Sequence, residues 1–103
     1  MLDDRKNAFE EEFILDEEQE FKAKAMASKL FGLWACEIMG IKKDNIDNYI
    51  KSLINLAIRN KDHQPIIDKV KNDLSQAGLN YDSKKLNHIF IEQLEKCQYN
   101  LSN

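Results

Sequence analysis

Glycine, proline and cysteine are all scarce in this chain of 103 residues, which holds three glycines, one proline and two cysteines. An all-β protein needs many tight turns, so the shortage of turn residues argues against that class. Three widely separated glycines cannot form a glycine-rich phosphate loop. A zinc site needs more ligands at close spacing, and neither histidine lies near a cysteine in sequence. We interpret Cys36 and Cys97 as reduced, half-buried thiols of a cytoplasmic protein.

Long hydrophobic runs are absent as well. No apolar run reaches 18 residues, so we expect no transmembrane helix and no direct insertion into a membrane. The first residues are acidic, which is not the composition of a signal or transit peptide. Hydrophobic residues make up 43% and charged residues 32%, which predicts one small domain with a modest core and solvated helix faces. We expect it to be a monomer when free.

Residues that could carry out catalysis are few. His63 follows Asp62 in an expected linker, where we predict that it is solvated. His88 occupies a polar position of the last expected helix, where we predict that it is exposed. No nucleophile, acid–base pair or metal-ligand cluster emerges, so we expect neither an enzyme nor a bound cofactor.

Charge is distributed unevenly along the chain. The first twenty residues hold nine acidic and two basic side chains, a net charge of −7, whereas residues 21–103 carry +4. The lysines of the second part are scattered and do not form a stripe, so nucleic-acid binding is not expected. Such asymmetry is typical of an interaction tail ahead of a folded body, and we divide the chain into residues 1–15 and 16–103.

The acidic segment also has an apolar edge. Leu2, Phe9 and Phe13 are spaced by seven and four residues, so on a helix they fall within about 40° of one another. One interpretation is binding of these residues in a groove of a partner, with the acidic side chains steering the segment toward a basic site. The alternative is that Phe9 and Phe13 fold back onto the body of the same chain.

Capping residues, glycines and the single proline predict where helices begin and end. Asp16 with Gln19 suits a capping box, Gly40 and Gly78 suit helix ends, and Pro65 suits a first turn. We also expect Asp82 to cap the last helix, Asp44 or a neighbour to cap the third, and Asp62 to Gln64 to supply caps before Pro65. The expected helices are 3–14, 17–39, 44–60, 64–77 and 83–99.

Apolar residues recur at helical spacing in the last four of these ranges. Their predicted buried faces are Ala23, Ala27, Leu30, Phe31, Trp34 and Ile38; Ile46, Ile50, Leu53 and Ala57; Ile67, Val70, Leu74 and Ala77; and Leu86, Phe90, Leu94 and Cys97. Short connections then favour an all-α fold, a four-helix bundle preceded by a short, mobile or partly helical N-terminal segment.

Gly32 and Trp34 lie together in the second range. A glycine inside a helix costs about 1 kcal/mol relative to alanine, which is tolerable where another helix crosses closely. Trp34 is expected to anchor the core, and the alternative is a ligand pocket beside it.

Three stretches resemble one family, the zeta-subunit inhibitor of the F-type ATP synthase of alphaproteobacteria. They are Leu2-Asp3-Asp4-Arg5-Lys6-Asn7-Ala8-Phe9-Glu10 with Phe13; Asp16-Glu17-Glu18 with Phe21-Lys22-Ala23; and Lys29-Leu30, Gly32-Leu33-Trp34-Ala35, Glu37 and Gly40. Further points of likeness are Lys69-Val70, Asp73-Leu74 and Ala77-Gly78. The likeness covers essentially the whole chain.

The resemblance implies a four-helix bundle whose N-terminal segment, about residues 1–19, inhibits the ATPase. It implies that this segment enters the interface of the α and β subunits of the ATP synthase head and blocks hydrolysis while sparing synthesis. The contacts that it implies are Leu2, Asp3, Asp4, Arg5, Phe9, Glu10 and Phe13. The protein would then be cytoplasmic and attached peripherally to the inner membrane through the ATP synthase.

One departure from the family concerns Met26 and Ala27, where many relatives have two consecutive arginines. If those charges help to hold the bundle on the ATPase, binding here is weaker. The family also implies weak adenine-nucleotide binding by the bundle. The alternative functions are therefore a nucleotide-binding bundle and an ATP synthase-associated factor that does not inhibit.

Overall fold

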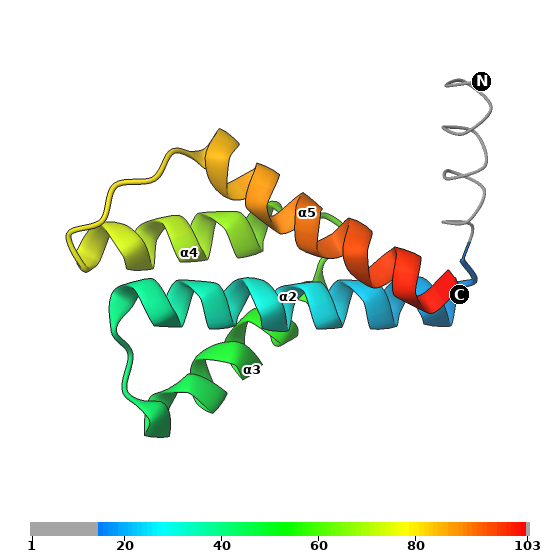
Figure 1. Ribbon diagram of the computed structural model, residues 1–103, viewed down its shortest axis with the longest axis horizontal. Helices are drawn as coiled ribbons and strands as arrows, with labels where there is room; N and C mark the ends of the chain where they lie inside the picture. Colours follow the sequence, from blue (N-terminus) through cyan, green and yellow to red (C-terminus); the bar gives the residue numbers. More distant parts are fainter. Residues whose placement is uncertain (1–14, 103) are drawn as a thin grey trace.

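A computed structural model describes residues 15–102, which form four helices and contain no strand (Figure 1). The helices are α2 (Glu17–Met39), α3 (Lys43–Arg59), α4 (Gln64–Gln76) and α5 (Ser83–Ser102). The all-α prediction is confirmed, and the four helices predicted after residue 15 correspond to the four that are observed. The expected helix 3–14 and nearly all of the predicted segment 1–15 lie outside the described residues.

Capping residues set the bounds of α2. The Asp16 carboxylate accepts a hydrogen bond from the Gln19 amide at 2.8 Å, and the Gln19 side chain accepts one from the Asp16 amide at 3.1 Å. This is the predicted capping box, which satisfies amides that the first helical turn leaves unpaired. At the other end Gly40 adopts a φ of 69°, and the Ile41 amide donates to the Cys36 carbonyl at 3.0 Å. A left-handed residue is the usual way to end a helix with its carbonyls satisfied.

The beginnings of the other helices match the predictions in part. The Asp82 carboxylate accepts from the Lys85 amide at 2.7 Å and so caps α5 as expected. The Asp62 carboxylate accepts from the Gln64 amide at 3.1 Å, just ahead of Pro65 in the first turn of α4. The cap expected at Asp44 is wrong, because α3 begins at Lys43 and no side chain caps it.

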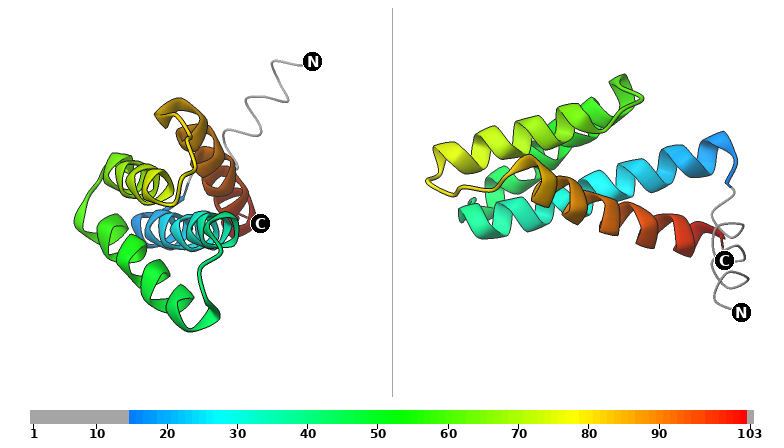
Figure 2. Two further views of the ribbon diagram at one scale, coloured as in Figure 1. Left: turned by 90° about the vertical axis from the view of Figure 1, so that its left-hand side faces the viewer. Right: turned by 90° about the horizontal axis from the view of Figure 1, so that it is seen from above.

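Helix α2 is the centre of the arrangement, because it packs against each of the other three helices. Viewed along its axis, α3 and α5 flank it on different sides, and α4 lies beside both α3 and α5 (Figure 2). The buried Phe31 of α2 meets Phe90 of α5 edge to face, with ring centroids 5.5 Å apart. This pair joins the two largest side chains of the core.

Close approach of α3 explains the glycine inside α2. A Cβ atom built on Gly32 would lie 2.9 Å from Cδ1 of Leu53 and 3.4 Å from Cγ1 of Ile50. Leu53 is fully buried and Ile50 nearly so, so neither side chain is free to withdraw. The predicted crossing of another helix at Gly32 is confirmed.

Several core positions differ from the predicted faces. Leu30 and Ala77 were expected inside, but Leu30 is 39% exposed and Ala77 also faces solvent. Ala35, Cys36 and Ile66 are buried instead. Because α2 has neighbours on several sides, its buried surface is wide and consists largely of small residues. The buried and exposed faces of α2 therefore differ little in hydrophobicity, and the buried face is hard to recognise from the sequence.

The two ends of the described chain meet. The Gln19 side chain donates to the Leu101 carbonyl at 3.5 Å, and the Gln98 side chain donates to the Glu20 carboxylate at 3.2 Å. The last turns of α5 therefore lie against the first turns of α2 (Figure 1). Within residues 15–102 no helix combines the length and the apolar composition that crossing a membrane requires.

Candidate functional site

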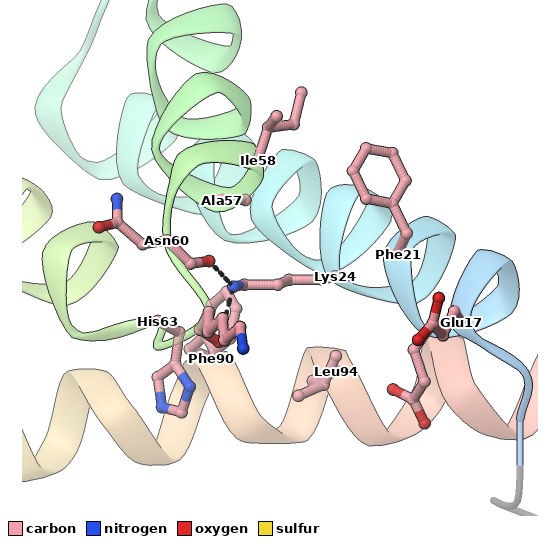
Figure 3. Close-up of a pocket in the computed structure, with 11 residues that line it drawn as sticks. Glu17, Phe21, Lys24, Ala57, Ile58, Asn60, His63, Phe90 and Leu94 are labelled. Atoms are coloured by element: carbon pink, nitrogen blue, oxygen red, sulfur yellow. Dashed lines mark hydrogen bonds between the residues drawn. The ribbon is translucent and has the colours of Figure 1, made fainter.

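A groove opens beside the first turns of α2, close to the point where residues 1–14 join the helix (Figure 3). It is formed by the beginning of α2, the end of α3, the connection that follows α3, and the middle of α5. Its volume is about 370 Å³. The lining residues are Glu17, Glu20, Phe21, Lys24, Ala57, Ile58, Asn60, Lys61, His63, Phe90 and Leu94.

The apolar part of the groove includes two large exposed side chains. Phe21 of α2 is 52% exposed and Ile58 of α3 is 53% exposed. Figure 3 shows them projecting on the same side of the groove, while Leu94 of α5 lies on the opposite side of Lys24. Apolar side chains gathered around a hollow mark a surface that gains free energy when it is covered.

Lys24 spans the floor of the groove. Its ammonium donates to the main-chain carbonyl oxygens of Asn60 and Lys61, the latter at 2.9 Å. The carbonyls at the end of α3 carry partial negative charge, so a cation is favourable there. Burial lowers the pKa of Lys24, and the Asp62 carboxylate opposes this shift. Lys24 thus fixes the connection between α3 and α4 against α2.

His63 lies at the inner end of the groove, and the prediction that it is solvated is wrong. Its ring stacks on Phe90, with centroids 4.9 Å apart and planes 20° from parallel. Its Nε2 atom is 2.7 Å from the side-chain oxygen of Asn87. The residues near His63 in the sequence do not indicate these contacts, because Phe90 and Asn87 belong to a helix more than twenty residues further along the chain.

A second polar cluster joins α3 to α4 on another part of the surface. The Tyr49 hydroxyl donates to the Asp73 carboxylate at 2.8 Å, and the Lys69 ammonium donates to the same oxygen at 3.1 Å. Burial and the adjacent carboxylate raise the pKa of Tyr49. The Lys69 ammonium also lies 5.2 Å from the Tyr49 ring centroid. All three groups are satisfied by one another, which suits a structural tie between helices.

The sequence-predicted site residues have different outcomes. Trp34 is partly buried, stacks on Phe31 at 5.7 Å and meets Tyr81 edge to face at 5.4 Å, as expected of a core anchor. The ligand pocket beside Trp34 stays a prediction. The expected contacts in the first segment lie outside the described residues: Leu2, Asp3, Asp4, Arg5, Phe9, Glu10 and Phe13.

The exposure predicted for the second histidine is confirmed, whereas the two thiols are buried more deeply than predicted. Cys36 and Cys97 are free, only 1% and 2% exposed, and burial raises the pKa of both thiols. They are therefore more deeply buried than the predicted half-burial. His88 is exposed, with its Nε2 atom 3.5 Å from the Glu92 carboxylate. Among residues 15–102 no group of three possible ligands could hold a metal ion.

Sequence reasoning did not identify Phe21, Lys24 and Ile58 as neighbours in a groove. One signal was present for Phe21, because it lies off the stripe formed by Ala23, Ala27 and Phe31. A large aromatic residue away from the buried stripe of its helix is a candidate surface contact. Ile58 carried the same kind of signal, since it lies about 100° around the helix from the buried Ala57.

Comparison with known proteins gives one match. The family model described as ATPase inhibitor subunit zeta matches residues 1–100. Neither the curated proteins nor the solved structures yield a match. The matched range includes the acidic N-terminal segment as well as the four helices.

Proposed function

Since the chain belongs to the ATPase inhibitor subunit zeta family, we propose that it binds the head of the F-type ATP synthase and blocks ATP hydrolysis with its N-terminal segment. The segment inserts at the interface between an α and a β subunit. The bundle remains outside that interface and carries the segment. The protein then acts at the cytoplasmic face of the membrane, attached through the ATP synthase, and it has a regulatory role.

The observation that carries this proposal is the extent of the family match. It begins at residue 1 and so covers the acidic segment, where Leu2, Phe9 and Phe13 share one side of a helical pattern. Burial of a phenylalanine side chain contributes about 1.5–3 kcal/mol relative to exposure. The cost of ordering the segment reduces that gain. The two phenylalanines together contribute about 3–6 kcal/mol before that cost, so other contacts of the segment must add to the affinity.

The charge of the N-terminal segment is expected to guide its approach to the ATPase. The segment's acidic side chains, among them Asp3, Asp4 and Glu10, favour encounter with a basic surface. Arg5 is then available to pair with a carboxylate of the partner. The family resemblance implies two consecutive arginines where this chain has Met26, which is 45% exposed, and Ala27, which is fully buried. If those arginines help to hold the bundle on the ATPase, the expected affinity of this chain is lower.

Steady-state ATP hydrolysis by the isolated ATPase head tests the proposal. The full chain is expected to reduce turnover, and Phe9→Ala combined with Phe13→Ala is expected to remove most of the inhibition. The matched control is Leu30→Ala combined with Leu33→Ala, which removes two exposed apolar side chains from α2. Equal loss of inhibition in both double variants would contradict the role of the segment.

Co-purification separates inhibition from mere association. If the full chain binds the head and leaves turnover unchanged, the protein is an ATP synthase-associated factor that does not inhibit. If it does not bind the head, the proposal is wrong. Crosslinks from position 9 or 13 to the α and β subunits would identify the interface.

Weak binding of an adenine nucleotide is a second candidate function. The groove favours it, because the exposed Phe21 ring could stack on a base and the Lys61 ammonium could meet a phosphate. Titration with ATP, followed through amide chemical shifts, tests this function. Changes around Phe21 and Lys61 would support the groove, and changes around Trp34 would support the pocket that the sequence suggested. The absence of both would exclude it.

A further inference from the structure

Among residues 15–102, no side chain covers the apolar side of the groove beside the first turns of α2. Phe21 and Ile58 are both more than half exposed, and they line the same groove as the buried Phe90 and the partly buried Leu94. Exposed apolar residues that are scattered singly need no explanation, but these two border one hollow (Figure 3). We propose that this groove is a docking site for residues 1–14 of the same chain, which occupy it when no ATPase is bound.

The point of attachment favours this occupant. Residues 1–14 join the described chain at Leu15, and Glu17 and Phe21 of the next two turns already line the groove. From Glu17 to Lys24 the helix rises by about 10 Å. Fourteen residues reach up to roughly 46 Å when fully extended. The segment is therefore long enough to cover the groove, and its tethering gives it a high effective concentration there.

The chemistry of the two surfaces is complementary. The segment carries Phe9 and Phe13, which match the apolar side made by Phe21 and Ile58. Between the two phenylalanines lie Glu10, Glu11 and Glu12. The groove's cations are Lys24, whose ammonium already binds two carbonyl oxygens, and Lys61 in the connection that follows α3.

Charge also sets the direction in which the segment lies. Glu17 and Glu20 line the groove near the start of α2, so the segment's acidic residues are repelled there. The favourable arrangement places Phe13 near Phe21 and the acidic run toward Lys61. Because these charges lie at the surface, their attraction weakens as salt is added.

The consequence for regulation rests on the proposed function. If Phe9 and Phe13 bind the groove in the free protein, they must leave it before they insert into the ATPase. Self-docking then competes with inhibition. A docked fraction of about 80% would raise the apparent dissociation constant for the ATPase about fivefold.

Paramagnetic broadening in the full chain tests the docking directly. A nitroxide attached at Lys6→Cys labels the segment, and the native thiols at 1% and 2% exposure are protected from the reagent. Amides of Phe21, Ile58 and Lys61 are expected to broaden. The amide of Asn80, in the loop at the other end of the molecule, serves as the reference and is expected to stay sharp (Figure 1).

Matched substitutions show whether the broadening depends on the groove. Ile58→Glu and Lys61→Glu are expected to remove the broadening, because they place a carboxylate against the acidic segment. Leu33→Glu changes a side chain that is 38% exposed on α2 outside the groove, and it is expected to retain the broadening. Unchanged amide spectra in the rest of the bundle verify that each variant is folded.

The outcomes separate the docking from the proposed function. Broadening that is absent, or that persists in both groove variants, overturns the docking whatever the ATPase assay gives. Broadening between a nitroxide-labelled copy and a ¹⁵N-labelled copy in a mixed sample overturns it in favour of a second copy. Broadening with no inhibition of the ATPase supports the docking and contradicts the proposed function instead. When both hold, Ile58→Glu is expected to inhibit more tightly than Leu33→Glu, by about fivefold for a docked fraction of about 80%.

Discussion

The Lys24 ammonium of α2 donates a hydrogen bond to the main-chain carbonyl oxygen of Lys61 at 2.9 Å. The same ammonium also binds the carbonyl of Asn60, so one side chain holds the connection between α3 and α4. Two carbonyls at a helix end would otherwise face the groove without this donor. The position of α3 relative to the start of α2 therefore depends on a lysine.

Lys24→Met is expected to lower the free energy of unfolding by about 1.5–3 kcal/mol, the range for hydrogen bonds to a charged group. Methionine keeps the length of the side chain but cannot donate. Urea denaturation followed by circular dichroism measures the change. Lys22→Met is the control, because Lys22 is exposed and its partner is the exposed Glu18 one turn earlier. An equal loss in both variants would mean that the carbonyl contacts contribute nothing.

Tyr49 predicts a fall in stability at alkaline pH. Its pKa is raised in the folded protein, so above about pH 10 the unfolded chain loses the phenolic proton while the folded chain keeps it. The unfolded state then binds fewer protons, and stability decreases as the pH rises. Cys36 and Cys97 act in the same direction from about pH 9, because burial raises the pKa of both thiols.

Tyr49→Phe is expected to flatten the part of this decline above pH 10 and to cost about 1 kcal/mol at neutral pH, through loss of the bond to Asp73. Denaturation midpoints from pH 7 to 11 measure both effects. Tyr99→Phe serves as the comparison, since Tyr99 has 40% exposure. A slope that Tyr49→Phe leaves unchanged would show that Tyr49 ionises normally in the folded state.

Gly32→Ala is expected to destabilise the bundle in spite of the better helix propensity of alanine. The gain in propensity is about 1 kcal/mol. The new Cβ would meet Leu53 at 2.9 Å in a fully buried place, and overpacking of this kind costs about 1–3 kcal/mol. Thermal unfolding should show a lower Tm for Gly32→Ala and a still lower one for Gly32→Val. A higher Tm for Gly32→Ala would show that α3 withdraws easily.

Replacement of the two histidines by alanine is expected to lower the stability of the protein by different amounts. His63→Ala loses the stacking on Phe90 and the contact with Asn87, so about 1–2 kcal/mol of stability is expected to disappear. His88→Ala is expected to change stability by less than about 0.5 kcal/mol, because that side chain is 77% exposed. Urea midpoints of the two variants provide the comparison. Similar losses in both would contradict the packing described for His63.

Local signals in the sequence predicted the helices well. Asp16 with Gln19, Gly40, and Asp82 each act through the backbone of nearby residues, so their roles follow from a few neighbouring letters. The observed bounds of α2, α3 and α4 accordingly lie within one residue of the expected ranges. α5 continues to Ser102 and so ends three residues beyond the expected helix, and the sequence offers no stop signal there.

Contacts between distant elements were harder to predict. His63 was expected to be solvated because its partners, Phe90 and Asn87, are supplied by α5. Leu30 was placed inside because it shares a helical spacing with Ala27 and Trp34, yet the smaller Ala35 and Cys36 occupy the crowded side of α2. The groove depends on Phe21 and Ile58 from two helices, and no spacing within either helix shows that they meet. The residues of the first segment that the family resemblance indicates stay predictions.

The contact between Gln19 and the Leu101 carbonyl has a practical consequence for anyone who modifies this protein. A fluorescent protein or affinity tag fused after α5 would sit beside the point where the proposed inhibitory segment joins α2, and it is expected to obstruct that segment. A tag inserted near Asn80, in the loop between α4 and α5, would lie at the other end of the molecule. Of two tags of equal size, the one after α5 would then lower the measured inhibition and the one near Asn80 would not.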